Sequence, residues 1–244
     1  MAKISSQDLG TQPITKLLIK QAVPASIGIL VMSLNILVDT IFVGNWIGSI
    51  AIAAINVVLP VSFFIAALGM SIGIGGSSII SRALGSKNSE KALKTFGNQI
   101  TLTLLLTITL VVLGLWFKDS IILSFGGKGN IFEPARIYYT IVLYGVPFLA
   151  LCMMGNTVIR AEGKPKFAMY AMMVPAVLNV LLDILFIKVF GWGMWGAGLA
   201  TSFAYTSLKD DTIKIQNRVS TINTTDVSAS TRLRYYEKGV DYFL

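Results

Sequence analysis

The sequence predicts an all-α integral membrane protein, a bundle of six transmembrane helices with its N-terminus in the cytoplasm. Of the 244 residues, 54% are hydrophobic and only 13% are charged, about half the charged content of a soluble domain. The few charges leave long uncharged stretches of the length that crosses a bilayer. Lysine and arginine are divided unequally between alternate loops, which predicts the orientation.

Six stretches satisfy the requirement of about 20 mostly apolar residues for a spanning helix. The first ends near Asp39, and residues 40–81 then carry no charge over a length too great for one helix. Gly44, Asn45, Gly48 and Ser49 interrupt this second stretch near its start. The predicted spans are residues 17–43, 50–80, 95–117, 137–159, 167–190 and 193–207.

The basic residues follow the positive-inside pattern. One set of alternate loops, which includes the N-terminal segment, contains ten of them up to Lys166, and the other set contains four. The richer set is expected in the cytoplasm, so the net charge of +8 reflects topology. Nucleic-acid binding is the alternative for a basic chain, but these residues do not gather into one stripe. We therefore expect a multi-pass protein of the cytoplasmic (inner) membrane, and no nucleic-acid partner.

A polar tail follows the sixth span. Residues 209–244 contain 11 charged residues and no apolar run, so we expect this segment to be disordered or out of frame. The sixth span has about 15 residues and would reach only about 22 Å, less than the hydrocarbon core of about 30 Å. These features favour a truncated or frame-shifted chain over a short helix with a natural cytoplasmic tail.

Enzyme chemistry has no support in the sequence. The chain contains no histidine and one cysteine, which excludes His-based triads, His metal sites and a disulfide scaffold. No other nucleophile–base pair or metal-ligand spacing is present. We expect no catalytic residues and no cofactor.

Two carboxylates provide the functional signal. Of the twelve acidic residues, only Asp39 and Asp183 lie within predicted spans, where an ionisable group is costly and is by default a functional candidate. Asp39 lies 19 residues beyond Lys20, and Asp183 lies 17 beyond Lys166. Both are therefore about 26–28 Å from the cytoplasmic ends of their helices. They share a level in the outer half of the bilayer, although ordinary interfacial positions would give the same depth.

Polar neighbours extend this pair into a predicted cation site. Asn35 precedes Asp39 by four residues and Asn179 precedes Asp183 by four, a spacing that places side chains on one helix face. Thr201 falls at a similar depth on the descending sixth span. With no Lys or Arg within a span at this level, the carboxylates must bind protons or a mobile cation.

Other intramembrane residues allow two interpretations each. Pro24 in the first span is either a hinge or a static kink. Asn156 in the fourth span either faces a cavity or bonds a neighbouring helix. Met172 belongs to a group of methionines in the fourth and fifth spans, which serve either adaptable binding of apolar ligands or packing.

Several short segments occur in a specific order between Lys16 and Ala204. They are Pro24 with Val38–Gly44, Gly75–Ser78 with Ser81–Gly85, Arg160–Lys166, Leu178–Ile187 and Gly196–Thr201. Each is weak alone. Together, in this order and spacing, they resemble the N-terminal half of multidrug and toxic compound extrusion (MATE) transporters.

The resemblance implies export of drugs, organic cations or toxic metabolites by antiport with inward Na⁺ or H⁺. It assigns the coupling-cation site to Asp39, Asn179, Asp183 and Thr201, and no other metal site is implied. It also implies that the first helix bends at Pro24.

The resemblance further suggests three residues for the wall of the substrate cavity, and these are Asn35, Asn156 and Met172.

The chain also departs from that family. MATE transporters have two six-helix lobes with the cavity between them, whereas this chain has one lobe, which we expect to be inactive alone. Its expected partners are the bilayer, small organic substrates, and a second lobe or a parallel homodimer, since such halves are related by an axis along the membrane normal. The alternatives are a lipid or polysaccharide flippase of the same superfamily and a non-transporting membrane protein.

Overall fold

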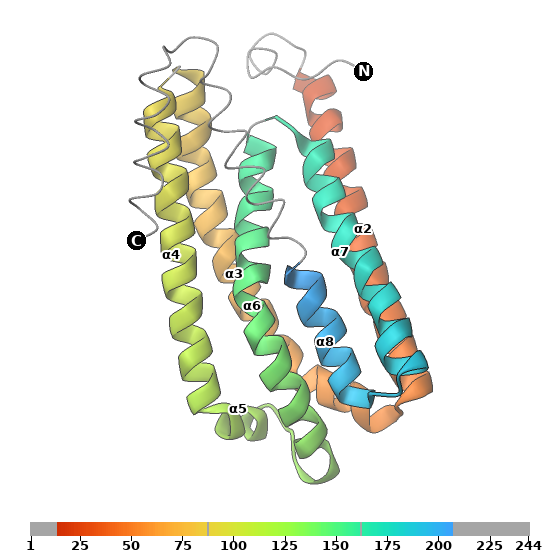
Figure 1. Cartoon of the computed structure of the whole chain (residues 1–244). Helices are drawn as coiled ribbons and strands as arrows, with labels where there is room; N and C mark the ends of the chain where they lie inside the picture. Colours follow the sequence, from red (N-terminus) through yellow and green to blue (C-terminus); the bar gives the residue numbers. More distant parts are fainter. Residues whose placement is uncertain (1–13, 87, 162, 207–244) are drawn as a thin grey trace.

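The computed structural model describes residues 14–86, 88–161 and 163–206, so the predicted tail at 209–244 lies outside the described residues. Within these ranges the chain forms helices and no strand (Figure 1). Five helical segments are long and apolar enough to cross a membrane. The predicted all-α membrane fold is confirmed.

The helices begin and end close to the predicted spans. The long ones are α2 (Ile14–Trp46), α3 (Ser49–Gly85), α4 (Ser89–Trp116), α6 (Phe132–Ala161) and α7 (Pro165–Asp183), and the shorter α8 covers Gly193–Thr206. Three further elements were not predicted: the short helix α5 (Lys118–Ser124), the 3₁₀ turn η1 (Gly129–Ile131) and the π-helical segment η2 (Ile184–Val189).

Local chemistry explains where the helices start and stop. Gly48 has φ of 119° between α2 and α3, a conformation that favours glycine, so the chain reverses there within two residues. The side chain of Asn88 accepts a hydrogen bond from the Lys91 N–H at the start of α4, as expected of an N-cap. Pro165 occupies the first position of α7, where its missing N–H costs nothing.

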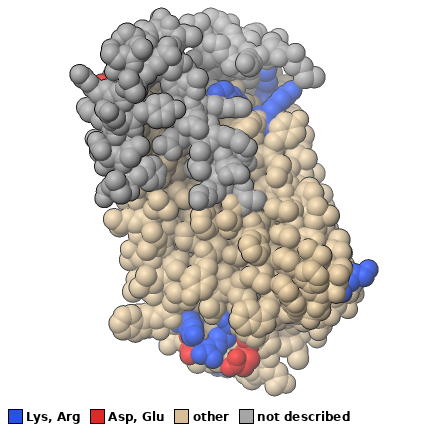
Figure 2. Space-filling model, viewed as in Figure 1, with Lys and Arg blue, Asp and Glu red and all other residues tan. Residues whose placement is uncertain are grey.

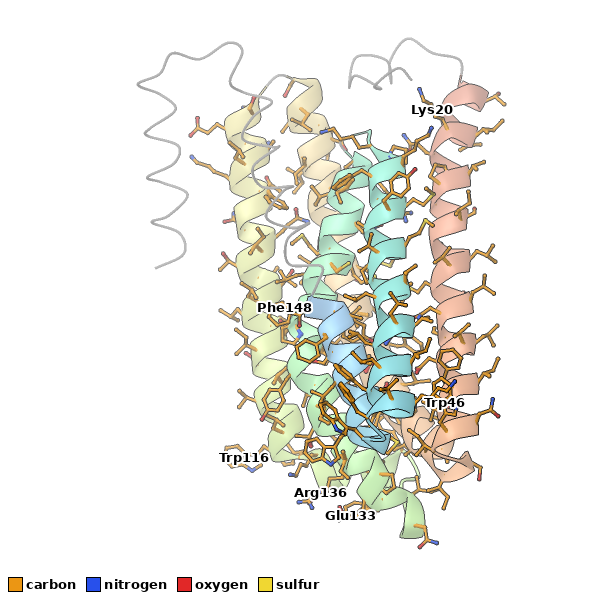
Figure 3. All side chains as sticks on the ribbon, turned by 45° about the vertical axis from the view of Figure 1, so that its right-hand side comes forward. Lys20, Trp46, Trp116, Glu133, Arg136 and Phe148 are labelled. Atoms are coloured by element: carbon orange, nitrogen blue, oxygen red, sulfur yellow. The ribbon has the colours of Figure 1, made fainter. Side chains whose placement is uncertain are left out.

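The two ends of the bundle carry most of its charges. Lys20 lies at the end where α2 begins, and Trp116, Glu133 and Arg136 lie at the opposite end near α5 (Figure 3). Arg136 Nε is 3.2 Å from Asp119 Oδ1, which ties α5 to α6. Between the ends, the described surface on the visible face is mostly uncharged, with one basic side chain at its right-hand edge (Figure 2). We refer below to the N-terminal end and the α5 end.

Glycines set the closest helix contacts. A Cβ added at Gly69 would lie 2.8 Å from Ala150 Cα, and one at Gly73 would lie 2.8 Å from Met154 Cα, so the α3 and α6 backbones are nearly in contact. Gly145 of α6 meets Ser202 of α8 in the same way. Small residues at helix crossings are typical of membrane bundles. They make α3, α6 and α8 one tightly packed group.

Helix α2 packs mainly on α7, and this pair stands beside the group of α3, α6 and α8 (Figure 1). Helix α8 has 14 residues and reaches about 21 Å, so it fills only the half of the bundle nearer α5 (Figure 1). Large apolar residues such as Leu30 and Leu105 point outward, as expected for lipid-facing surfaces. The space between the helix pair and the helix group is where the functional side chains meet.

Candidate functional site

A cavity of about 180 Å³ lies between the α2–α7 pair and helices α3, α6 and α8. Its wall contains polar residues, among them Asn35, Asp39 and Asn179. It also has an apolar part with Met32, Met153, Met172, Phe63 and Leu149. A mostly apolar wall with a few polar groups is the usual composition of a small-molecule site.

The two intramembrane carboxylates lie beside each other, with Asp39 on the cavity wall and Asp183 outside the residues that line it. Asp183 is 0% exposed, and its carboxyl group interacts directly with that of Asp39. Neither oxygen of Asp183 has a hydrogen-bond partner among the described residues, and neither has Asp39 Oδ1. No Lys or Arg is among the residues that line the cavity. Asp183 is thus buried and Asp39 half-buried, and among the described residues no Lys or Arg forms an ion pair with either carboxylate.

Amide and hydroxyl groups line the same cavity as Asp39. Asn35 Nδ2 donates to Asn179 Oδ1 at 3.0 Å and to the Ala176 carbonyl at 3.1 Å, which joins α2 to α7. Thr201 donates to the Ala197 carbonyl at 3.0 Å, and its Oγ1 is 3.5 Å from the Tyr138 hydroxyl. The structure thus brings Asn179 and Thr201 to the cavity that Asp39 lines.

The backbone at Asp183 changes geometry. Asp183 is the last residue of the α-helical part of α7, and the next six residues form the π-helical η2. The wider turn ends with the Phe190 N–H donating to the Leu185 carbonyl. Short π segments inside helices are frequent at functional sites. The sequence contains the aspartate but no signal for this change of helix type.

The chain reaches α8 through a tight turn. Gly191 and Gly193 have φ of 66° and 54°, conformations that favour glycine. The turn directs α8 back along α6, where Gly198 packs against Ile141. Thr201 is thereby placed next to Tyr138 of α6.

The remaining predicted residues divide between the cavity and its surroundings. Asn35 and Met172 line the cavity. Asn156 does not line it, and its Nδ2 donates to the Ala168 carbonyl at 2.9 Å, which is the helix-bonding alternative. Pro24 is buried within α2, outside the cavity wall.

Several cavity residues were missed by reasoning from the sequence. Tyr138 and Tyr205 line the cavity from α6 and α8, and Asn56 and Ser62 line it from α3. A tyrosine near the end of a span is typical of the membrane interface, so Tyr138 gave no distinct signal. Asn56 and Ser62 are polar residues six apart within an uncharged run, and this was the signal that could have identified them.

The site offers oxygens of three kinds but no conventional metal cluster. Within the described parts of the chain, no three His, Cys, Asp or Glu side chains are grouped as metal ligands. Two carboxylates with a neighbouring amide and hydroxyl are nevertheless hard oxygen donors, which suit a hard cation. Protonation of one carboxyl group would remove one of the two negative charges.

Comparison with known proteins identifies similar sequences. The MatE family model matches residues 24–185. A curated relative, "Probable multidrug resistance protein YoeA" of Bacillus subtilis (strain 168), is 32% identical over 183 residues, covering 73% of this chain and 40% of the relative. "Multidrug export protein MepA" of Staphylococcus aureus (strain MRSA252) is 28% identical over 192 residues, covering 79% and 43%.

Solved structures show the same fold. A structure described as the outward-facing conformation of a multidrug resistance MATE family transporter of the MOP superfamily matches with a TM-score of 0.78 and 31% identity. The match covers 88% of this chain and 47% of that one. This chain therefore spans less than half the length of these two relatives and of that transporter.

Proposed function

This chain belongs to the MatE family of membrane transporters, and from that premise we propose that it is the N-terminal lobe of a cation-coupled antiporter that exports drugs, organic cations or toxic metabolites. The observation that carries the proposal is the pair of carboxylates at the edge of a mostly apolar cavity, buried Asp183 and half-buried Asp39, which has no fixed counter-charge among the described residues.

The coupling-cation site consists of Asp39, Asn179, Asp183 and Thr201. Two buried negative charges side by side are strongly unfavourable unless a cation or protons neutralise them. The pair therefore loads a Na⁺ ion or a proton and, when that charge leaves, returns to an unstable state. A site that alternates between a cation-loaded and an unloaded state is what a transporter needs in order to use an ion gradient.

The cavity next to this site holds the exported substrate. Asn35 supplies a polar contact, and Met172 supplies an adaptable apolar one. An organic cation is attracted by the same carboxylates that hold the coupling ion. Competition between the two cations for one negative site makes them exchange, which is antiport.

Bending of α2 at Pro24 couples ion binding to movement. Proline at position 24 removes the N–H that would bond the Lys20 carbonyl, so this turn lacks one backbone bond. Beyond it, α2 carries Asn35 and Asp39 into the site. Loading or unloading the carboxylates therefore acts on the helix segment that follows the weakened turn.

The lobe lies in the cytoplasmic membrane with its N-terminus inside, as the distribution of basic residues supports. Transport requires a second lobe, from a longer polypeptide or from a parallel second copy, so this lobe alone is inactive. A lipid or polysaccharide flippase is less well supported, because the curated relatives described above are multidrug proteins.

Direct cation binding tests this proposal. Radioactive Na⁺ is titrated onto the full chain in detergent, for the wild type and for Asp39→Asn, Asp183→Asn and the surface control Asp119→Asn. We expect the first two variants to lose Na⁺ binding and Asp119→Asn to retain it. For a proton-coupled protein the same variants instead lose proton uptake. Cation or proton binding that survives both site variants would contradict the assignment.

A further inference from the structure

Arg160, in the last turn of α6, is a half-buried cation with an unusual set of contacts. Its Nη2 lies 3.7 Å from the Met172 sulfur, and its Nε is buried without a hydrogen-bond partner. No carboxylate among the described residues forms an ion pair with it. Its only polar contact in this part of the chain is therefore a thioether, which is a weak acceptor.

The other described arginines show what this one lacks. Arg136 pairs with Asp119 and Glu133 at the α5 end. Arg82 is exposed and donates to the carbonyl and the hydroxyl of Ser78. A guanidinium withdrawn from water normally binds an anion through two parallel N–H groups. In Arg160 the edge formed by Nε and Nη2 is that pair, and the Met172 sulfur contacts its Nη2 atom.

Met172 separates this edge from the cavity. Its side chain lines the cavity, and its sulfur would lie 3.1 Å from a Cβ added at Gly28. It therefore fills the gap between α2 and the end of α6. A methionine side chain is unbranched and changes rotamer easily, so a small rotation would open the Arg160 edge to the cavity.

We propose that Arg160 is a subsite for an acidic group, a carboxylate or a phosphate, which binds the Nε–Nη2 edge in the place that the Met172 sulfur now occupies. Met172 is eleven residues from Asp183 along the α7 segment, about 16 Å. The cavity thus has a negative pole near Asp39 and Asp183 and a positive pole behind Met172. This arrangement fits an amphoteric small molecule with its amine and its acidic group at opposite ends.

The choice of substrate class rests on the proposed export function, whereas binding of the anion does not. A phosphate of a lipid headgroup at the N-terminal end offers the same chemistry as the acidic group of a cavity ligand. The two sources differ in how they reach Arg160. A cavity ligand has to pass Met172, whereas a lipid headgroup does not.

The test uses the full chain in detergent and two probes. The first is sodium benzoate, compared with sodium chloride at equal concentration so that Na⁺ is constant, with the midpoint of thermal unfolding as the readout. The second is phosphatidylglycerol, counted as bound molecules by native mass spectrometry. The variants are Arg160→Gln, Arg160→Lys and the exposed control Arg82→Gln.

We expect the wild type and Arg82→Gln to respond to at least one probe, either by stabilisation with benzoate or by retention of phosphatidylglycerol. We expect Arg160→Gln to lose that response. A benzoate response assigns the subsite to cavity ligands, and retained lipid alone assigns it to headgroups. If Arg160→Gln does not fold, Arg160→Lys is tested in its place. Lysine keeps the positive charge but lacks the two parallel N–H groups, so its response should be weaker than that of the wild type. A response equal to the wild type in the folded Arg160 variants overturns the proposal.

A further variant separates this inference from the proposed function. Asp39→Asn removes one carboxylate of the coupling site and leaves Arg160 unchanged, so the benzoate or lipid response should persist while Na⁺ or proton binding is lost. The reverse result, with cation binding intact and no anion response in any folded protein, would leave the export proposal standing and overturn the anion subsite.

Discussion

Asp183 shows how far single residues could be predicted. The cost of a charge inside a span identified it and Asp39 from the sequence, and the i, i+4 spacing identified Asn35 and Asn179. The structure places Asp183 at 0% exposure with no donor to either oxygen among the described residues. Tyr138 could not be predicted in this way, because its position near a span end has an ordinary explanation at the membrane interface.

The first prediction concerns Asp183→Asn. The charged carboxylate destabilises the unloaded site, so the neutral variant should unfold at a higher temperature than the wild type in Na⁺-free buffer. Na⁺ at a hundred times its dissociation constant should stabilise the wild type by about 2.7 kcal/mol and leave Asp183→Asn unchanged. Thermal unfolding in detergent with Na⁺ or with choline measures both. An equal Na⁺ effect on the two proteins would count against a cation at this residue.

The second prediction concerns the close contact between α3 and α4 at Gly76. A Cβ there would lie 2.6 Å from Gln99 Cγ, whereas at Gly75 nothing lies within 4 Å. Gln99 is held in place by bonds from Nε2 to the Ile72 and Gly73 carbonyls at 2.8 and 3.2 Å. Gly76→Ala should therefore cost about 1–3 kcal/mol through overpacking. Gly75→Ala is the matched control and should gain up to about 1 kcal/mol of helix propensity.

Unfolding in mixed detergent and sodium dodecyl sulfate measures this difference. The double variant Gly76→Ala with Gln99→Ala should recover part of the loss, since the clash depends on both side chains. Equal effects of the two glycine substitutions would mean that α3 and α4 are not in close contact at this position. The sequence indicated small residues in this span but not which of them face a neighbour.

At the level of elements, long apolar runs located the helices well and the connections poorly. Spans predicted from uncharged length fall inside α2, α3 and α6, and the third span ends one residue beyond α4, because the bilayer thickness dictates such lengths. Helix α5 has seven residues, which is too short to be predicted from the length of uncharged runs. The π-helical η2 has the same apolar composition as an α-helix, so only packing of the complete chain could specify it.

The third prediction concerns α2 and its internal proline. Pro24→Ala restores an N–H that can bond the Lys20 carbonyl, so amide exchange in this turn should slow. Intrinsic helix propensity should gain up to about 3 kcal/mol. Hydrogen exchange with mass spectrometry on the full chain measures the change. Pro60→Ala in α3 restores one bond in the same way and serves as the control.

If α2 bends at Pro24, the Pro24→Ala and Pro60→Ala variants should differ in how far the slower exchange extends. Helix α2 contacts mainly α7, whereas α3 packs closely on both α6 and α4. Slower exchange should therefore extend along α2 toward Asn35 in Pro24→Ala and remain local in Pro60→Ala. Exchange that slows only next to the substituted residue in both variants would contradict bending of α2 as a unit.

For the whole molecule, the fold class could be predicted from composition. The position of the cavity could be seen only in the structure. The sequence placed polar residues at similar depths, but depth does not specify which helices are neighbours. The structure shows α2 packed mainly on α7, with this pair beside α3, α6 and α8, and the cavity lies where residues of these five helices meet. Neighbour relations depend on small-residue contacts such as Gly145 with Ser202, which the sequence alone did not reveal.

The fourth prediction concerns orientation, a property of the entire chain in its membrane. Ten basic residues up to Lys166 lie on one set of loops and four lie on the other, and this bias should keep the N-terminal end in the cytoplasm. Ser86 and Asn130 are exposed at the N-terminal and α5 ends respectively. Replacing the buried Cys152 by Ala leaves one reactive thiol in each of the variants Ser86→Cys and Asn130→Cys.

In intact cells, a membrane-impermeant maleimide should then label Asn130→Cys and leave Ser86→Cys unlabelled. Permeabilised cells should show labelling of both, which controls for the reactivity of each thiol. If Ser86→Cys is labelled in intact cells and Asn130→Cys is not, the lobe has the opposite orientation. Its carboxylates would then lie nearer the cytoplasm, and the driving ion would have to reach them through the bundle from the N-terminal end. The orientation experiment therefore decides from which side of the membrane the proposed site is loaded.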